Sequence, residues 1–365
     1  DTTLKELGEA SGRFHLTVYL EAWRLSVNVD IDNRGTADVG PLQSFVSSAF
    51  SSALVQGDVW ALDVMTIPNT PEELTYVGGL VDFPVGADGI RVGLRGSFSG
   101  INPDGKKGLL DTRTSTRELG VYAGFRPMRT REASLDVVIS ANLRHAEEQD
   151  LSGTLYDDRI QAVSLTADYQ LHDRYQGSNY FAVGVRQGHG EPGSAGAGLS
   201  RFDGDGDFYK IFWNAARNQR LDGPWSVLLS TSGQWTSSQL LQSEQFYIGG
   251  PLLGRAFSTG ALIGDSGLTG LLEMRFDSMR EAGPIMGYQL YAFVDAGIVW
   301  SRDSPEQESL SSYGAGIRVT LQDDYRAGFE IAMPIDYHSH SSQDSGTRFL
   351  FSLSKSFKNC APGCR

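Results

Sequence analysis

The segment from Glu244 to Gly267 holds one arginine, Arg255, among closely spaced glycines. Gly249, Gly250 and Gly254 make this segment pliable and let its backbone pack closely against a neighbour. If the segment folds into an interior, the guanidinium of Arg255 needs a carboxylate partner, because an unpaired buried charge is costly. Such a pair can be bidentate. The residue types therefore predict a charge-paired lock.

Two carboxylates after this segment are candidate partners for Arg255. Asp295 alternates with Val294 and shares the polar face of its segment with Phe293, and Glu273 lies on the polar face of 267–277. We predict the pair Arg255–Asp295, with Glu273 as the second candidate. The alternative is that Arg255 contacts solvent or lipid sugar and that Asp295 is a hydrated carboxylate.

Residue patterns for catalysis are weak. Gly264-Asp265-Ser266-Gly267 matches a serine-protease nucleophile segment in letters only, without a histidine or oxyanion context. His338 and His340 lie among serines in a polar loop, where solvation is favoured over metal binding. We expect no enzymatic activity, no metal and no cofactor.

The composition limits the class of protein. The chain has 365 residues, 40% of them hydrophobic, and no segment approaches the ~18 apolar residues of a membrane helix. A β-barrel remains compatible, because only alternate residues of its strands face lipid. The 43 glycines and 18 phenylalanines suit tight turns and aromatic girdles. A net charge of -13 argues against a nucleic-acid partner.

Apolar and polar residues alternate along most of the chain, as in Trp23–Ile31. The segments are about 10 to 14 residues long, which suits tilted membrane strands better than the ~5–6 residues of soluble sheets. The alternative is a soluble sandwich or propeller with its apolar faces inward. We expect about sixteen strands, near 22–33, 42–54, 57–67, 71–83, 89–99, 116–127, 132–144, 156–171, 177–187, 206–218, 224–236, 267–277, 286–300, 309–321, 325–335 and 347–357.

The connections alternate in length. Short turns rich in Gly, Asp or Pro are expected near 55–56, 84–88, 128–131, 172–176, 219–223 and 322–324, and long polar loops near 100–115, 145–155, 188–205, 237–266 and 334–346. Short periplasmic turns and long external loops are typical of outer-membrane barrels. We therefore expect an all-β transmembrane barrel of antiparallel strands over 22–357, in the outer membrane of a Gram-negative bacterium, with both termini periplasmic.

The two ends of the chain differ from this pattern. Residues 1–21 contain one more alternating segment near 14–20, which is either an N-terminal arm or the last strand of a periplasmic domain. Residues 358–365 are expected to be a tail. Its cysteines, Cys360 and Cys364, lie either in a loose segment or in a small disulfide of an oxidising compartment.

Four motifs in the right order resemble the outer-membrane translocators of two-partner secretion, the haemolysin-activator type. The family's FxLGG and VRGY/F segments match Phe246-Tyr-Ile-Gly-Gly250 and Gly254-Arg-Ala-Phe257, where Gly254 and Ala256 replace Val and Gly. Its GDxG…E(L/M)R segment matches Gly264-Asp-Ser-Gly267 and Glu273-Met-Arg275. Its FxDxG motif matches Phe293-Val-Asp-Ala-Gly297, and its DNRG motif matches Asp32-Asn-Arg-Gly35, followed by Gly40. The resemblance spans roughly 12–357.

The resemblance implies a lid loop, 237–266, tucked into the pore and held by arginine against the aspartate of the FxDxG strand. The lid residues are then Gly249, Gly250, Gly254, Arg255, Phe257, Gly264 and Asp265, and the lumen partners are Asp295, Glu273, Phe293 and Gly297. The implied function is export of one large partner exoprotein, such as an adhesin or haemolysin, in extended form and without ATP. In this family periplasmic repeats recognise the cargo.

The C-terminal strand carries Phe349, Phe351 and Phe357 on one face, which looks like the signal that the barrel-assembly machinery reads. Outer-membrane lipid and lipopolysaccharide are the other expected partners. Two alternative functions stay open. One is a barrel-assembly insertase of the same superfamily, with a weak seam between the first and last strands. The other is a passive porin, whose conductance would survive deletion of 237–266.

Overall fold

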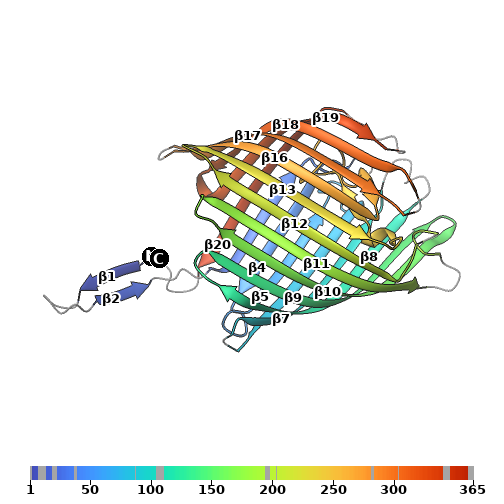
Figure 1. The fold of residues 1–365 in the computed structure, drawn as a ribbon, viewed down its shortest axis with the longest axis horizontal. Coiled ribbons are helices and arrows are strands. Elements are labelled where there is room, and N and C mark those ends of the chain that lie inside the picture. The colour runs from blue at the N-terminus through green and yellow to red at the C-terminus, as the bar shows by residue number, and fades with distance from the viewer. Residues whose placement is uncertain are drawn as a thin grey trace.

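The protein forms a closed barrel of antiparallel strands, seen in a computed structural model (Figure 1). The structure describes residues 2–6, 14–18, 23–36, 39–86, 88–103, 111–193, 198–202, 204–280, 283–302, 304–339 and 346–360. Within these ranges sixteen strands follow one another around the barrel, each hydrogen-bonded to the next, and the last pairs with the first. The predicted fold class and strand number are confirmed.

The barrel strands lie close to the predicted segments. Their bounds are β3 (Trp23–Asp32), β4 (Gln43–Ser51), β5 (Val59–Thr66), β6 (Leu74–Val85), β7 (Ile90–Ile101), β8 (Arg113–Arg129), β9 (Ala133–Asp150), β10 (Gly153–His172), β11 (Gly177–Pro192), β12 (Phe208–Arg220), β13 (Trp225–Thr236), β16 (Ser266–Met279), β17 (Ile285–Trp300), β18 (Gln307–Leu321), β19 (Tyr325–His338) and β20 (Arg348–Cys360).

Four strands lie outside the barrel sheet. The strands β1 (Thr2–Glu6) and β2 (Phe14–Val18) pair antiparallel with each other. The strands β14 (Phe246–Ile248) and β15 (Leu262–Gly264) form a small hairpin within the long connection between β13 and β16. Two single 3-10 turns, η2 (Gln242–Glu244) and η3 (Gln322–Asp324), complete the described elements. Among the described residues, no helix is long and apolar enough to cross a membrane.

The apolar side chains of the barrel strands point outward and the polar ones inward. Along β16, the exposed Leu268, Leu272 and Met274 alternate with the buried Thr269 and Glu273. The soluble-sandwich alternative requires the opposite arrangement, with its apolar faces packed together. An apolar outer surface of this extent is stable only against lipid. The outer surface of the barrel is therefore suited to a lipid bilayer.

The two ends of the barrel differ in their connections, as predicted (Figure 1). One end has the short turns, together with the start of β3 and the end of β20. The prediction of a long loop at 145–155 is wrong. The strand β9 continues to Asp150 and β10 begins at Gly153, with a short turn between them. Backbone pairing continues there beyond the apolar band, so the end of the apolar alternation does not mark the end of the strands.

The barrel closes by pairing β20 with β3 along the whole of β3. Pairing extends to Cys360, so the expected strand end at Phe357 is three residues short. The side chain of Asn33, from the DNRG motif, continues the seam. Its Nδ2 donates to the carbonyl of Phe349 at 2.9 Å, and its Oδ1 accepts the N–H of Phe351 at 2.8 Å.

The buried apolar core lies inside the barrel, under the connection between β13 and β16. One cluster joins Phe257, Ile248 and Leu262 of this connection to the inner wall of β16–β20. A second, smaller cluster joins Leu240 and Leu241 to inward residues of β10 and β12. The barrel interior is thus apolar mainly where this connection packs against the inner wall. We call residues 237–265 the inserted loop.

Candidate functional site

The inserted loop passes from one wall of the barrel to another. It leaves β13, forms η2 near β9, β11 and β12, and continues into the β14–β15 hairpin, which packs against β16 and β17. The tip between β14 and β15, residues 249–261, carries Arg255 and Phe257. Phe257 is fully buried and stacks on Tyr337 of β19, with ring centroids 5.3 Å apart. Its carbonyl oxygen accepts a hydrogen bond of 2.6 Å from Arg348 of β20.

The tip adopts backbone conformations that favour glycine. Gly249, Gly250 and Gly254 have φ values of 114°, 104° and 72°. At Gly249 a Cβ atom would also lie 2.2 Å from the backbone carbonyl oxygen of Ser258, across the tip. The glycines therefore set the shape that brings Arg255 to the wall.

Gly249→Ala should loosen the tip more than Gly260→Ala. Both residues have positive φ, but a Cβ at Gly260 (φ 74°) meets only the Tyr247 ring, at 3.6 Å. The left-handed backbone alone costs about 1–2 kcal/mol, and the clash with Ser258 adds to this only at Gly249. The measurement is the rate of trypsin cleavage after Arg255 in the detergent-purified barrel. Equal rates in the two variants would show that the tip does not depend on this close approach.

Arg255 is buried, with an exposed fraction of 6%, and its guanidinium binds two carboxylates. Its Nη1 donates to Oε2 of Glu273 on β16 at 2.9 Å and to Oε2 of Glu330 on β19 at 3.1 Å. The side chain also lies over the ring of Phe293, with Cζ 4.3 Å from the ring centroid. These contacts of Arg255, which we call the lock, join the tip to three strands.

Asp295 contacts the backbone of Arg255, where the sequence predicts a contact with the guanidinium. Its Oδ2 accepts the Arg255 N–H at 3.4 Å, and its Oδ1 accepts the Ser312 hydroxyl at 2.5 Å. The strand register explains this arrangement. Glu273 lies opposite Phe293, so a guanidinium over the Phe293 ring reaches Glu273, while Asp295 lies two residues further along β17, beside the backbone. Of the two carboxylates that the sequence predicts as partners, Glu273 binds the guanidinium and Asp295 does not.

Further donors surround the two carboxylates of the lock. Arg275 and Arg318 donate to the fully buried Glu273, at 2.7 Å and 2.9 Å for their shortest bonds. Glu330 accepts the Tyr291 hydroxyl at 2.7 Å and lies 3.4 Å from Arg34 of the DNRG motif. The sequence pattern alone does not reveal a role for Glu330 or Arg34. The alternation of β19 places Glu330 on the polar face, but pairing with Arg255 depends on the curvature of the barrel.

Gly297 of the FxDxG motif allows the hairpin to approach the wall. A Cβ at this position would lie 2.8 Å from Cδ1 of Ile248 in β14. Gly264 lies at the end of β15, next to Asp265. Both glycines therefore lie where the β14–β15 hairpin meets the barrel wall.

A second charged anchor, missed by sequence reasoning, lies at the base of the loop. Glu244 in η2 is 2% exposed and binds Arg186 of β11 at 2.9 Å and Lys210 of β12 at 2.9 Å. Arg144 of β9 approaches Glu244 at 3.2 Å and donates to the carbonyl of Ser243 at 2.7 Å. Burial alone would raise the pKa of Glu244, but the charges of Lys210, Arg186 and Arg144 outweigh it and lower this pKa to about 2.

A third anchor, Asp265, lies where the loop returns to the barrel. Its fully buried carboxylate binds Arg201 at 2.6 Å and accepts the N–H of Leu240 at 2.9 Å and that of Arg302 at 2.8 Å. It joins the start and the end of the inserted loop to two neighbouring connections. The Gly264-Asp265-Ser266-Gly267 motif thus holds the two ends of the inserted loop together through the carboxylate of Asp265.

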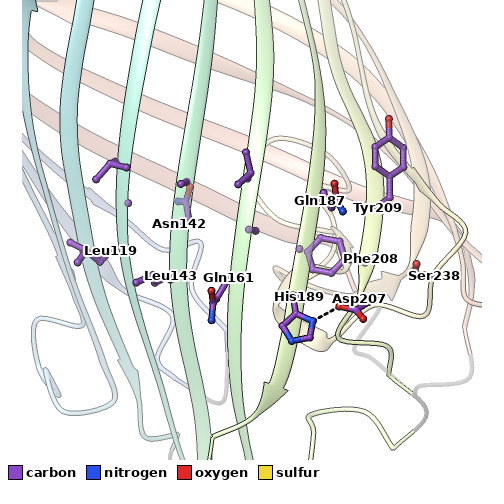
Figure 2. Close-up of a pocket in the computed structure, with 16 residues that line it drawn as sticks. Leu119, Asn142, Leu143, Gln161, Gln187, His189, Asp207, Phe208, Tyr209 and Ser238 are labelled. Atoms are coloured by element: carbon purple, nitrogen blue, oxygen red, sulfur yellow. Dashed lines mark hydrogen bonds and ion pairs between the residues drawn. The ribbon is translucent and has the colours of Figure 1, made fainter.

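A large depression in the barrel wall lies away from Arg255. It has a volume of about 870 Å³ and spans β8–β12 (Figure 2). Several of the side chains that line it, including Leu119, Leu143 and Tyr209, belong to the exposed apolar face. Figure 2 also shows His189 paired with Asp207 at its edge. This depression therefore belongs to the lipid-facing surface.

The remaining predicted residues lie apart from the lock. Phe349, Phe351 and Phe357 are exposed on the outer face of β20. His338 pairs with Asp336 at 3.0 Å, while His340 lies outside the described residues. Cys360 is the last residue of β20. The structure does not describe the Cys360 side chain or any part of Cys364, so the disulfide between them stays a prediction.

Comparison with known proteins gives consistent matches. Residues 16–319 match the family model described as haemolysin secretion/activation protein ShlB/FhaC/HecB. No curated protein matches the sequence. Among solved structures, CdiB from Escherichia coli is similar with a TM-score of 0.81 at 17% identity, covering 98% of this chain and 67% of that one.

Two further solved structures share the fold. CdiB from Acinetobacter baumannii has a TM-score of 0.72 at 16% identity, over 98% of this chain and 65% of that one. BamA from Haemophilus ducreyi lacking POTRA domains 1-3 has a TM-score of 0.63 at 13% identity, over 98% of this chain and 75% of that one. The chain thus spans about two thirds of the length of the two CdiB structures.

Proposed function

The chain belongs to the ShlB/FhaC/HecB family of haemolysin secretion/activation proteins, the outer-membrane translocators of two-partner secretion, and we propose that its barrel exports one partner exoprotein past a gate formed by the inserted loop. The fold and the family are of a transporter type. The cargo is an adhesin- or haemolysin-like chain that passes in extended form. No step of this proposal uses a nucleotide, because folding of the cargo outside the cell prevents its return.

One observation carries the proposed gate: a loop inside the barrel is held to the wall by a buried ion pair. Arg255 reaches Glu273 and Glu330 from the loop tip, while Glu244 and Asp265 fix the base of the loop. The polar inner face lets an extended chain cross without exposing its backbone to lipid.

The two anchors at the base and the lock at the tip suggest how the gate works. Glu244 has three cationic partners, whereas the tip depends on the single cation Arg255. We propose that the tip leaves the wall while the base stays fixed. The passage then opens on the side of β16–β19, where the tip is packed in the closed state.

We also propose an orientation of the barrel in the membrane and a set of partners. The end with the short turns faces the periplasm, so both chain termini lie there, and the inserted loop starts from the external end. Residues 1–21 form an arm or the edge of a periplasmic domain. The barrel-assembly machinery reads the aromatic face of β20 with Phe349, Phe351 and Phe357, and lipid and lipopolysaccharide cover the apolar wall.

The insertase alternative predicts a weak seam between the first and last strands. Here β20 pairs with β3 along the whole of β3, and Asn33 adds two hydrogen bonds to β20. This geometry favours a stable wall around a pore over a wall that opens sideways.

Deletion of the gene should abolish secretion of one exoprotein and leave the other outer-membrane proteins at normal levels. The reason is that a translocator serves its cargo, whereas an insertase serves many barrels. The measurement is quantitative mass spectrometry of culture medium and outer membranes, with the gene restored on a plasmid as control. Loss of many barrel proteins from the outer membrane would contradict export and support the insertase function.

A further inference from the structure

Beneath the loop tip the barrel encloses a cavity of about 560 Å³ that is rich in arginine. Five arginines line it: Arg34, Arg255, Arg275, Arg318 and Arg326. They come from the DNRG motif, the loop tip, β16, β18 and β19. Glu330 also lines the cavity, and Glu273 lies buried beneath the arginines. Five arginines against these two carboxylates leave an excess of three positive charges.

Two guanidinium groups in this cavity have unused hydrogen-bond donors. The Nε of Arg255 and the Nη1 of Arg34 are buried and have no hydrogen-bond partner among the described residues. A buried donor without a partner is costly, so such groups mark places where a ligand or water completes the site. An acceptor with negative charge satisfies both the donors and the excess charge.

Of the five arginines, Arg326 is the most accessible to a ligand carboxylate. It is exposed toward the cavity, and no carboxylate in the described part of the chain lies within ion-pair distance of it. The nearest in register is Asp30, two strands away along the row Arg326–Ser354–Asp30. Arg326 interacts electrostatically with Asp30 but forms no ion pair with it, so its guanidinium can bind a charge that enters the interior.

The rest of the lining suits a polypeptide. Ser230, Ser352 and Ser354 offer hydroxyl groups, while Leu252 and Leu253 of the tip offer apolar surface. Leu252 is 78% exposed, so the closed loop presents an uncovered apolar side chain beside the arginines. A peptide segment that bears a carboxylate next to an apolar residue can use both surfaces.

We propose that this cavity is a binding site for carboxylate side chains of an extended polypeptide inside the barrel. This inference rests on the proposed export function. It adds that acidic residues with apolar neighbours in the passing chain bind under the tip. Because Arg255 lines the same cavity, a bound carboxylate approaches the guanidinium that holds the tip. Cargo in the interior thereby competes with Glu273 and Glu330 for the lock.

The test is direct binding of a labelled peptide to the full-length protein in detergent, measured by fluorescence anisotropy. The probe is a short peptide of Glu, Leu, Gly and Ser, compared with the same peptide carrying Gln in place of Glu. We expect binding of the Glu peptide only, weakened by salt. Arg326→Gln should raise its Kd about tenfold, the effect of one hydrogen bond to a charged group. Equal binding of the Gln peptide would overturn the proposal.

Two controls make the result specific. Arg95→Gln removes a lumen-facing arginine of β7 that binds Asn142 outside this cavity, and it should leave the Kd unchanged. Heat-modified migration in gels shows that each variant keeps a folded barrel. Inorganic phosphate that displaces the peptide at equal concentration would show a site for any anion and would contradict the peptide assignment. Because binding is measured without cargo, loss of export with intact binding would refute the export function alone.

Discussion

Arg255→Ala should raise the ion conductance of the barrel and abolish export of its cargo, while the barrel still inserts into the membrane. Removing one member of a buried ion pair costs about 3–5 kcal/mol. Here the cost falls at the lower end of that range, because Glu273 keeps Arg275 and Arg318, and Glu330 keeps Arg34 and Tyr291. About 3 kcal/mol shifts the balance between closed and open loop by roughly a hundredfold.

The measurement is single-channel current in planar bilayers, with secretion of the exoprotein in cells as the second assay. Arg255→Lys is the matched control. It keeps the charge but loses the planar guanidinium that lies over the Phe293 ring, so we expect an intermediate effect. A conductance that stays at the wild-type level in Arg255→Ala would support the passive-porin alternative.

A double-mutant cycle separates the two contacts of Arg255. The guanidinium binds Glu330, whereas Asp295 accepts the backbone N–H, which alanine retains. Arg255→Ala and Glu330→Gln should therefore be strongly non-additive, by about 1–3 kcal/mol. Arg255→Ala and Asp295→Ala should add within about 0.5 kcal/mol. The opposite result would show that the guanidinium binds Asp295 in the membrane.

Glu244→Gln should detach the base of the inserted loop and lower the thermal stability of the barrel. The substitution keeps the shape of the side chain but leaves the buried cations Arg186 and Lys210, and the partly exposed Arg144, without their shared carboxylate. A loss of about 3–5 kcal/mol is expected for a broken buried ion pair. The measurement is the temperature at which the detergent-purified barrel loses its folded migration.

Glu118→Gln is the matched control for this substitution. Glu118 on β8 also binds Arg144, at 2.7 Å, but both side chains are partly exposed, so its loss should cost much less than that of Glu244. The double variant Glu244→Gln with Lys210→Met should recover part of the stability, because one uncompensated cation is removed. Equal stability of Glu244→Gln and the wild type would refute the role of the base anchor.

The base anchor should also resist acid. Because the folded pKa of Glu244 is lowered to about 2, its contribution to stability is present above the unfolded pKa of about 4.3 and is lost as pH falls from there through about 2. Conductance should therefore not change through release of this anchor between pH 7 and pH 5.

Local residue patterns were enough to predict the class of the fold and to indicate which segment carries the candidate site. Alternation in strands such as β16 and β17 fixed which side chains face lipid, because successive residues of a strand point to opposite faces. The glycines around Arg255 and the motifs of the family identified the inserted loop and named Glu273 and Asp295 as its partners. These inferences depend on local spacing, which the chain displays directly.

Which charged groups meet depends on the three-dimensional arrangement of the strands. Alternation gives a side chain its face but not its neighbours across a curved wall, so it could not choose between Glu273 and Asp295 for the guanidinium. Glu330 lies 75 positions after Arg255, and Glu244 meets Lys210 and Arg186 only because the loop crosses the interior. Closure of the barrel, through the register of its strands, brings these distant residues together.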